Sequence, residues 1–215
     1  MSQKPVFSFW TRLVRIIFYA VFLLIVAQIL MLDAEQSVGD LKFSESSWTE
    51  TSQQTFVLIT ALLFIVLALL SKEHRGLAFL AAAFFSMAFV REFNNYLGEG
   101  IFTGGWQTYT ILVGGILGFL AYKNRKGFYH STDLMFHHSG FGLLTSGVLV
   151  TFFFSRLYGR GDFWKTVMEE RYFRTVKNAS EEGIELLGYS LILIGTIELL
   201  IYLVRNPKPS GTAEP

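Results

Sequence analysis

The stretch IELLGYSLILIGTIELLIYLV, residues Ile184–Val204, decides the fold class of this chain. It runs for 21 residues, and its only charged side chains are Glu185 and Glu198. A helix needs about 20 mostly apolar residues to cross the hydrocarbon core of a bilayer. The stretch therefore predicts a transmembrane helix that carries two carboxylates.

The rest of the chain repeats this pattern of long apolar blocks. Hydrophobic residues make up 52% of the 215 residues and charged residues only 16%, whereas about a quarter is charged in an ordinary soluble domain. Five further blocks have suitable length: Leu13–Leu32, Phe56–Leu70, Leu77–Val90 extended to about Leu97, Trp106–Tyr122 and Leu134–Phe154. We predict an all-α, polytopic transmembrane bundle of about six helices that forms one domain over residues 1–206. Residues 207–215 are predicted to be a disordered tail.

The distribution of Lys and Arg predicts the orientation, because cytoplasmic loops carry an excess of both. Basic residues precede the first block and fall in every second connection, while the loop from Asp33 to Gln54 holds Lys42 among five acidic residues. Both termini are then cytoplasmic, and we expect a multi-pass protein of the bacterial inner membrane, since the compact chain has no eukaryotic targeting signal.

One segment disagrees with this orientation. The connection from Arg156 to Ser180 would be external, yet it contains six basic residues. Residues 160–178 either lie along the interface as an amphipathic segment, with Phe163 and Trp164 at helical spacing, or one of the six blocks does not cross the membrane.

Composition and motifs exclude several classes of function. A net charge of +1 does not provide the basic surface that nucleic-acid binding needs. The absence of cysteine excludes disulfides and thiolate sites. The chain has no phosphate-binding loop, dinucleotide fingerprint or GxSxG motif, so we expect no ATP-coupled chemistry and no cofactor other than a divalent cation, and an enzyme is the less favoured class.

Carboxylates near the predicted outer leaflet form the first candidate site, because charge at membrane depth is costly and often functional. Glu181, Glu182 and Glu185 share one face of the last block with small and polar residues. Glu92 lies on a face of the third block that is rich in alanine. We expect these two faces to pack together, with Arg91 and Arg156 at the same depth.

Two interpretations of these carboxylates remain open. Clustered carboxylates either share a proton or bind a cation, or they form ordinary helix-end contacts and ion pairs. Separations within about 6 Å with few arginine contacts would favour the ion site. Full pairing with Arg91 or Arg156 would favour carboxylates that clamp helices.

The cytoplasmic side holds a second candidate site. Glu198 has no basic neighbour in the sequence and needs a partner from another helix. Asp133, His137 and His138 could relay protons or bind a metal, although their spacing matches no metal motif.

Three functions follow. The first is a small proton- or cation-coupled transport component that uses Glu92, Glu182, Glu185 and Glu198. The second is a non-catalytic scaffold or assembly subunit, and the third is an intramembrane metal enzyme at Asp133, His137 and His138. Six helices rarely enclose a pathway alone, so the first implies a homodimer. Gly114 and Gly118 form a small-residue face for a second copy or a partner subunit.

Overall fold

The computed structural model describes residues 9–36, 43, 47–93 and 105–205, and this part of the chain contains helices and no strand. Its elements are α1 (Phe9–Gln36), α2 (Trp48–Leu70), α3 (Arg75–Glu92), α5 (Gly105–Lys123), α6 (Phe128–Phe136), α7 (Ser139–Leu149), a π turn (Val150–Phe154), α8 (Ser155–Tyr158), α9 (Gly161–Met168), a 3-10 turn (Glu169–Arg171) and α10 (Arg174–Arg205). The all-α prediction is confirmed.

Four helical segments of the described chain are long and apolar enough to cross a membrane. They are Phe9–Glu35, Trp48–Leu70, Ser139–Tyr158 and Arg174–Arg205. The chain is therefore a helical membrane protein. The helices α3 and α5 do not belong to this group, because α3 contains three charged residues and α5 begins with a polar turn. The count of six crossings stays a prediction.

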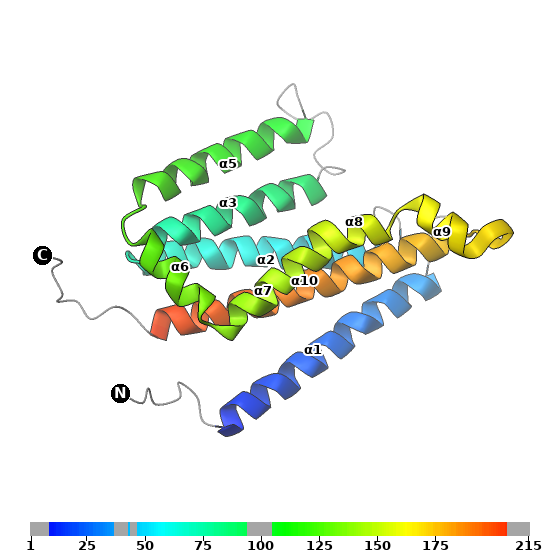
Figure 1. Ribbon diagram of the computed structural model, residues 1–215, viewed down its shortest axis with the longest axis horizontal. Coiled ribbons are helices and arrows are strands. Elements are labelled where there is room, and N and C mark those ends of the chain that lie inside the picture. The colour runs from blue at the N-terminus through cyan, green and yellow to red at the C-terminus, as the bar shows by residue number, and fades with distance from the viewer. Residues whose placement is uncertain (1–8, 37–42, 44–46, 94–104, 206–215) are drawn as a thin grey trace, which may run out of the picture.

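The long helices lie side by side and alternate in direction (Figure 1). The helix α3 packs between α5 and α2, and α10 packs between α2 and α7. The helix α1 crosses beside α10 and α2 with far fewer contacts. The first turn of α1 and the last turn of α10 lie at the same end of the bundle. We call this the terminal end and the opposite one the distal end.

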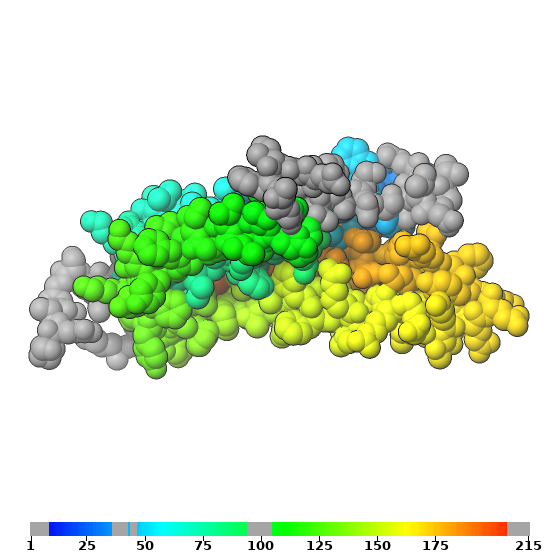
Figure 2. Space-filling view, turned by 90° about the horizontal axis from the view of Figure 1, so that it is seen from above, coloured from blue at the N-terminus to red at the C-terminus, as the bar shows by residue number. Residues whose placement is uncertain are grey.

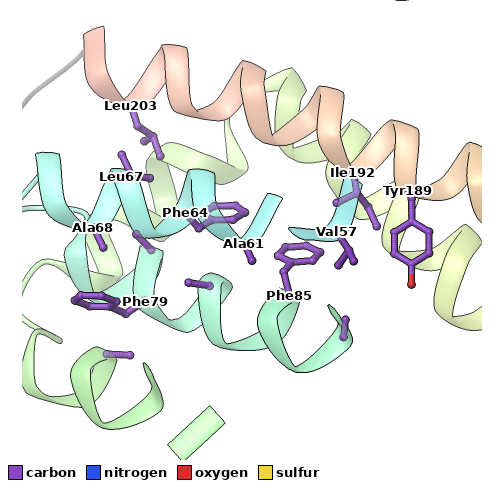
Figure 3. Close-up of a cluster of buried hydrophobic side chains, with 14 residues drawn as sticks. Val57, Ala61, Phe64, Leu67, Ala68, Phe79, Phe85, Tyr189, Ile192 and Leu203 are labelled. Carbon is purple, nitrogen blue, oxygen red and sulfur yellow. The ribbon is translucent and has the colours of Figure 1, made fainter. Parts of the chain in front are cut away.

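The core lies where α2, α3 and α10 meet (Figure 3). Phe64 of α2 and Phe85 of α3 stack with ring centroids 5.8 Å apart, and Tyr189 and Ile192 of α10 are fully buried beside them. Alanines on α3, such as Ala78 and Ala82, allow the neighbouring helices to approach closely.

The small residues of α10 pack against α7 and the π turn that follows it, which corrects the expected pairing of this face with the alanine face of α3. A Cβ atom on Gly188 would lie 2.1 Å from Oγ1 of Thr151, and one on Gly195 would lie 2.4 Å from the backbone nitrogen of Leu144. Only glycine allows this approach. The alanine face of α3 instead meets α2 and α5 because α2 lies between α3 and α10.

Several predicted boundaries differ from those in the structure. The block Leu134–Phe154 is broken, since α6 ends at Phe136 and a new helix begins at Ser139. The side chain of His138 caps this new helix by accepting a hydrogen bond from the backbone N–H of Gly140. The last helix begins at Arg174, ten residues before Ile184, because Lys177, Ser180 and the carboxylates tolerate helical conformation without being apolar.

The predicted amphipathic segment 160–178 contains α9 and the start of α10. Trp164 donates its indole N–H to the carbonyl oxygen of Tyr158 at 2.8 Å, which links α9 to the end of α8. Lys177 forms an ion pair with Glu181, and Lys165 lies 3.8 Å from Asp162. These two lysines are among the six basic residues of the connection from Arg156 to Ser180, which is external in the predicted orientation, and both therefore have acidic partners. The extension of the third block to Leu97 and the tail 207–215 lie outside the described residues.

Large apolar side chains cover much of the outer surface. Figure 2 looks onto α5, whose Ile111, Ile116 and Phe119 are each at least 60% exposed. In the apolar part of α1, only 6% of the residues are buried. Exposed apolar area of this extent is expected of a surface that faces lipid or a protein partner.

Candidate functional site

The distal end of the bundle holds a cluster of charged residues from three helices, which we call the Glu92 cluster. Its members are Arg91 and Glu92 of α3, Arg156 of α8, and Glu182 and Glu185 of α10. Arg91, Glu92 and Glu185 lie in predicted apolar blocks, and Arg156 and Glu182 lie two residues outside the ends of theirs.

Arg156 bridges two of the carboxylates. Its guanidinium lies 3.5 Å from Oε1 of Glu185 and 4.0 Å from Oε1 of Glu92. Arg91 forms a second ion pair with Glu92 at 2.5 Å, and Tyr189 donates its hydroxyl to the same carboxylate at 3.1 Å. Glu92 thus joins α3 to α8 and α10.

Glu185 is the most buried member of the cluster, with 4% of its surface exposed. Ser155 donates its hydroxyl to Glu185 at 3.0 Å. Ser155 and Arg156 directly follow the π turn. A π turn adds one residue to the helical turn, so it rotates the residues that follow by about 100°. This rotation brings Ser155 and Arg156 to the side of α8 that faces α10.

Glu182 has a different environment. Its Oε2 atom accepts a hydrogen bond from the amide of Gln53 at 2.9 Å, and the same amide donates to the Glu182 carbonyl oxygen. No ion pair to Glu182 is found within the described residues. Glu181 is separate from the cluster and pairs with Lys177, and its carboxylate packs against Gly159.

The terminal end holds a smaller group, the Glu198 cluster, which consists of Glu198, Arg15 and Tyr19. Arg15 forms an ion pair with Glu198, and Tyr19 donates its hydroxyl to the same carboxylate. Both partners belong to α1 and lie one helical turn apart on one face. This contact ties α1 to α10.

The two histidines and Glu198 line one groove at the terminal end, but each histidine ring has a different partner. His137 is exposed and contacts Asp133 in its own helical turn. His138 caps α7 and stacks on Tyr202 with ring centroids 4.3 Å apart. Burial, and then the charge of Arg15, lower the pKa of His138, so this side chain is neutral at pH 7.

No group of three metal-ligating side chains occurs in the part of the chain that the structure describes. The expected divalent-cation site and the site for an intramembrane metal enzyme therefore have no set of ligands among these residues. Asp133 and His137 interact with each other at the surface, and His138 is engaged in helix capping.

Another buried carboxylate, Asp33, was not predicted from the sequence. Asp33 at the end of α1 is 2% exposed. It accepts hydrogen bonds from the backbone N–H groups of Trp48 and Thr49 at 2.9 and 2.8 Å, and from the Thr49 hydroxyl. These N–H groups begin α2 and have no partner within that helix. Asp33 thus fixes the connection between α1 and α2.

Sequence reasoning also missed the neutral partners Tyr19, Gln53, Ser155 and Tyr189. The signal for Arg15 and Tyr19 is present in their spacing of four residues within an apolar helix. Gln53 carries no such signal, because polar residues are common in the first turns of a membrane helix.

The glycines proposed as a partner face have different surroundings. A Cβ on Gly114 would lie 2.5 Å from the sulfur of Met87, so Gly114 packs against α3 within the chain. Gly118 has nothing within 4 Å of that position and faces outward.

Comparisons with known proteins do not extend this description: no protein-family model, curated protein or solved structure matches the chain.

Proposed function

We propose that this protein is a multi-pass membrane scaffold, a non-catalytic subunit whose buried charges hold its helices in a fixed arrangement. The observation that carries the proposal is the bridge that Arg156 forms between Glu92 and Glu185. Arg15–Glu198 and the Asp33 cap act in the same way at other places. The contacts of Arg156 and Arg15 join helices that are far apart in the sequence, and the Asp33 cap joins the consecutive helices α1 and α2.

The chemistry of the carboxylates supports this proposal. Glu92, Glu185 and Glu198 each contact an arginine. A carboxylate that already contacts a guanidinium is a poor ligand for a passing cation. Such a pair is costly to break once it is buried, which suits a structural role.

We further propose that the chain crosses a bacterial inner membrane six times with both termini in the cytoplasm. The alternating direction of the long helices supports this topology, as does the position of α3 and α5 alongside the four apolar helices (Figure 1). The outward-facing surface of α5 around Gly118 is the face we assign to a second copy or partner subunit.

Glu182 favours a second function, the proton- or cation-coupled transport component. Its carboxylate is hydrogen-bonded to Gln53 and makes no ion pair within the described residues. The nearby Glu185 shares Arg156 with Glu92. A site with more carboxylates than arginines retains the capacity to take up a proton.

One experiment separates the two functions. The variants Glu185→Gln and Glu198→Gln are purified in detergent for thermal unfolding and chemical cross-linking of copies, and reconstituted in vesicles for proton flux. The scaffold proposal predicts lower thermal stability or weaker cross-linking. The transport function predicts that the parent protein conducts protons, that both variants lose this flux, and that the variants remain as stable as the parent.

The matched control is Glu170→Gln, which removes an exposed carboxylate of the 3-10 turn. It should behave like the parent in all assays. If Glu185→Gln and Glu198→Gln also behave like the parent in stability, cross-linking and flux, neither function is correct.

A further inference from the structure

A groove of about 520 Å³ opens on the terminal end of the bundle, between α1 and the start of α7. Its floor is α10, where Glu198 and Tyr202 line it. Arg12 and Ile16 line it from α1, and His138 and Leu143 line it from the other wall. The groove exists because α1 packs loosely against α10 and leaves the side toward α7 uncovered.

On each wall of this groove the lining changes from a polar to an apolar residue with depth, and the neutralised Arg15–Glu198 pair and Tyr19 also line the groove. Arg12 lies in the first turn of α1 and His138 directly precedes α7. Ile16 and Leu143 lie four or five residues further along their helices, which corresponds to about 6–7 Å deeper. An amphiphile whose polar group stays at the mouth matches this gradient.

The mouth of the groove carries a net positive charge. Arg15 and Glu198 neutralise each other. Arg12 is exposed and makes no ion pair within the described residues. His138 and Tyr202 stack on each other beside it and offer polar ring atoms without a negative charge.

We propose that this groove binds an anionic glycerophospholipid of the surrounding membrane, with its phosphodiester at Arg12 and the upper part of its acyl chains along Ile16 and Leu143. A guanidinium forms charge-assisted hydrogen bonds with phosphate oxygens. Lipid is the occupant that the surroundings favour, because the α1 wall continues into an exposed apolar surface that includes Val14, Ile17 and Phe18. The inference does not depend on the proposed scaffold function.

The test is a lipid titration of the purified full-length protein in detergent, read out by thermal unfolding. Phosphatidylglycerol should raise the unfolding temperature of the parent. Arg12→Gln should require about tenfold more of this lipid for the same shift, because one charge-assisted hydrogen bond is lost. Leu143→Trp should reduce the lipid effect similarly by filling the groove without changing its charge.

Three controls make the result specific. Lys126→Gln removes an exposed cation near the end of α5 at the same end of the bundle and should leave the response unchanged. Phosphatidylcholine and glycerol 1-phosphate should each give a much smaller shift than phosphatidylglycerol. Equal shifts with phosphatidylcholine would overturn the preference for an anionic lipid, and equal shifts with glycerol 1-phosphate would assign the groove to a soluble anion. An unchanged response of Arg12→Gln would overturn the site itself.

Discussion

The two ends of the bundle use the same chemistry in different ways. At the distal end, Glu92 and Glu185 share two arginines, a tyrosine and a serine from α3, α8 and α10. At the terminal end, Glu198 depends on Arg15 and Tyr19 from α1. A carboxylate of the distal network therefore keeps partners on other helices when one of its contacts is removed. At the terminal end both partners of Glu198 belong to α1, and this helix has little other packing that could replace their contact with α10.

The largest effect is expected at the close contact between α7 and α10, which holds α8 and its Arg156 beside the distal carboxylates. In Gly147→Val the new Cβ would lie 2.6 Å from the carbonyl oxygen of Gly188 and 2.7 Å from the backbone nitrogen of Ile192. Backbone atoms cannot move aside, so α7 separates from α10 and unfolding becomes easier by about 3 kcal/mol or more. The yield of folded protein and its unfolding temperature measure this loss. Gly142→Val, at an open position of the same helix, is the matched control and should resemble the parent.

The second largest loss of stability is expected at the contact between Arg15 of α1 and Glu198 of α10. Glu198→Gln leaves Arg15 without its carboxylate partner in a largely buried position, which should cost about 2–3 kcal/mol. Amide hydrogen exchange should rise mainly in α1, because its remaining contacts are few. Unchanged exchange in α1 would show that other contacts hold this helix in place.

A smaller effect is expected in the network. Arg156→Gln removes two contacts, but Glu92 keeps Arg91 and Tyr189, and Glu185 keeps Ser155. The guanidinium is also half exposed, so the loss should be about 1 kcal/mol. The free energy of unfolding checks it, with Arg171→Gln on the exposed 3-10 turn as the control. A loss larger than that of Glu198→Gln would reverse the comparison between the two ends.

The smallest effect is a dependence of stability on pH, and it is expected only at the terminal end. Burial lowers the pKa of His74 below its usual 6.5, and the ring lies 2.8 Å from the hydroxyl of Ser131 in α6. The folded state therefore binds fewer protons than the unfolded state as the pH falls below 6.5, and stability decreases with acidification. Hydrogen exchange around the α2–α3 turn and α6 should rise between pH 7 and pH 5.5. His74→Gln should weaken this dependence, and an equal rise in the variant would exclude His74 as its source.

Much of this architecture could be predicted from the sequence, because the bilayer imposes one requirement on every crossing. The apolar blocks revealed the long helices, and the cost of charge at membrane depth singled out Glu92, Glu185 and Glu198. The partners were harder to find. Arg15 lies at the edge of an apolar block, where a basic residue also fits the ordinary preference for the cytoplasmic side.

Helix neighbours could not be predicted from faces alone. The small faces of α3 and α10 are each suited to close packing, but they are equally suited to other helices. In the structure, Gly195 of α10 packs against Leu144 of α7, and Gly188 packs against Thr151 of the π turn that follows α7. The break at His138 was also missed, since a histidine in a polar stretch gives no clear sign that it caps a helix.

Partly buried ion pairs hold these helices together, and the Arg15–Glu198 pair offers the most direct test. The free energy of unfolding is measured for Arg15→Gln, Glu198→Gln and the double variant. The account predicts that the two losses are not additive and that the pair is coupled by about 1 kcal/mol or more. Additive losses, with no coupling between Arg15 and Glu198, would contradict it.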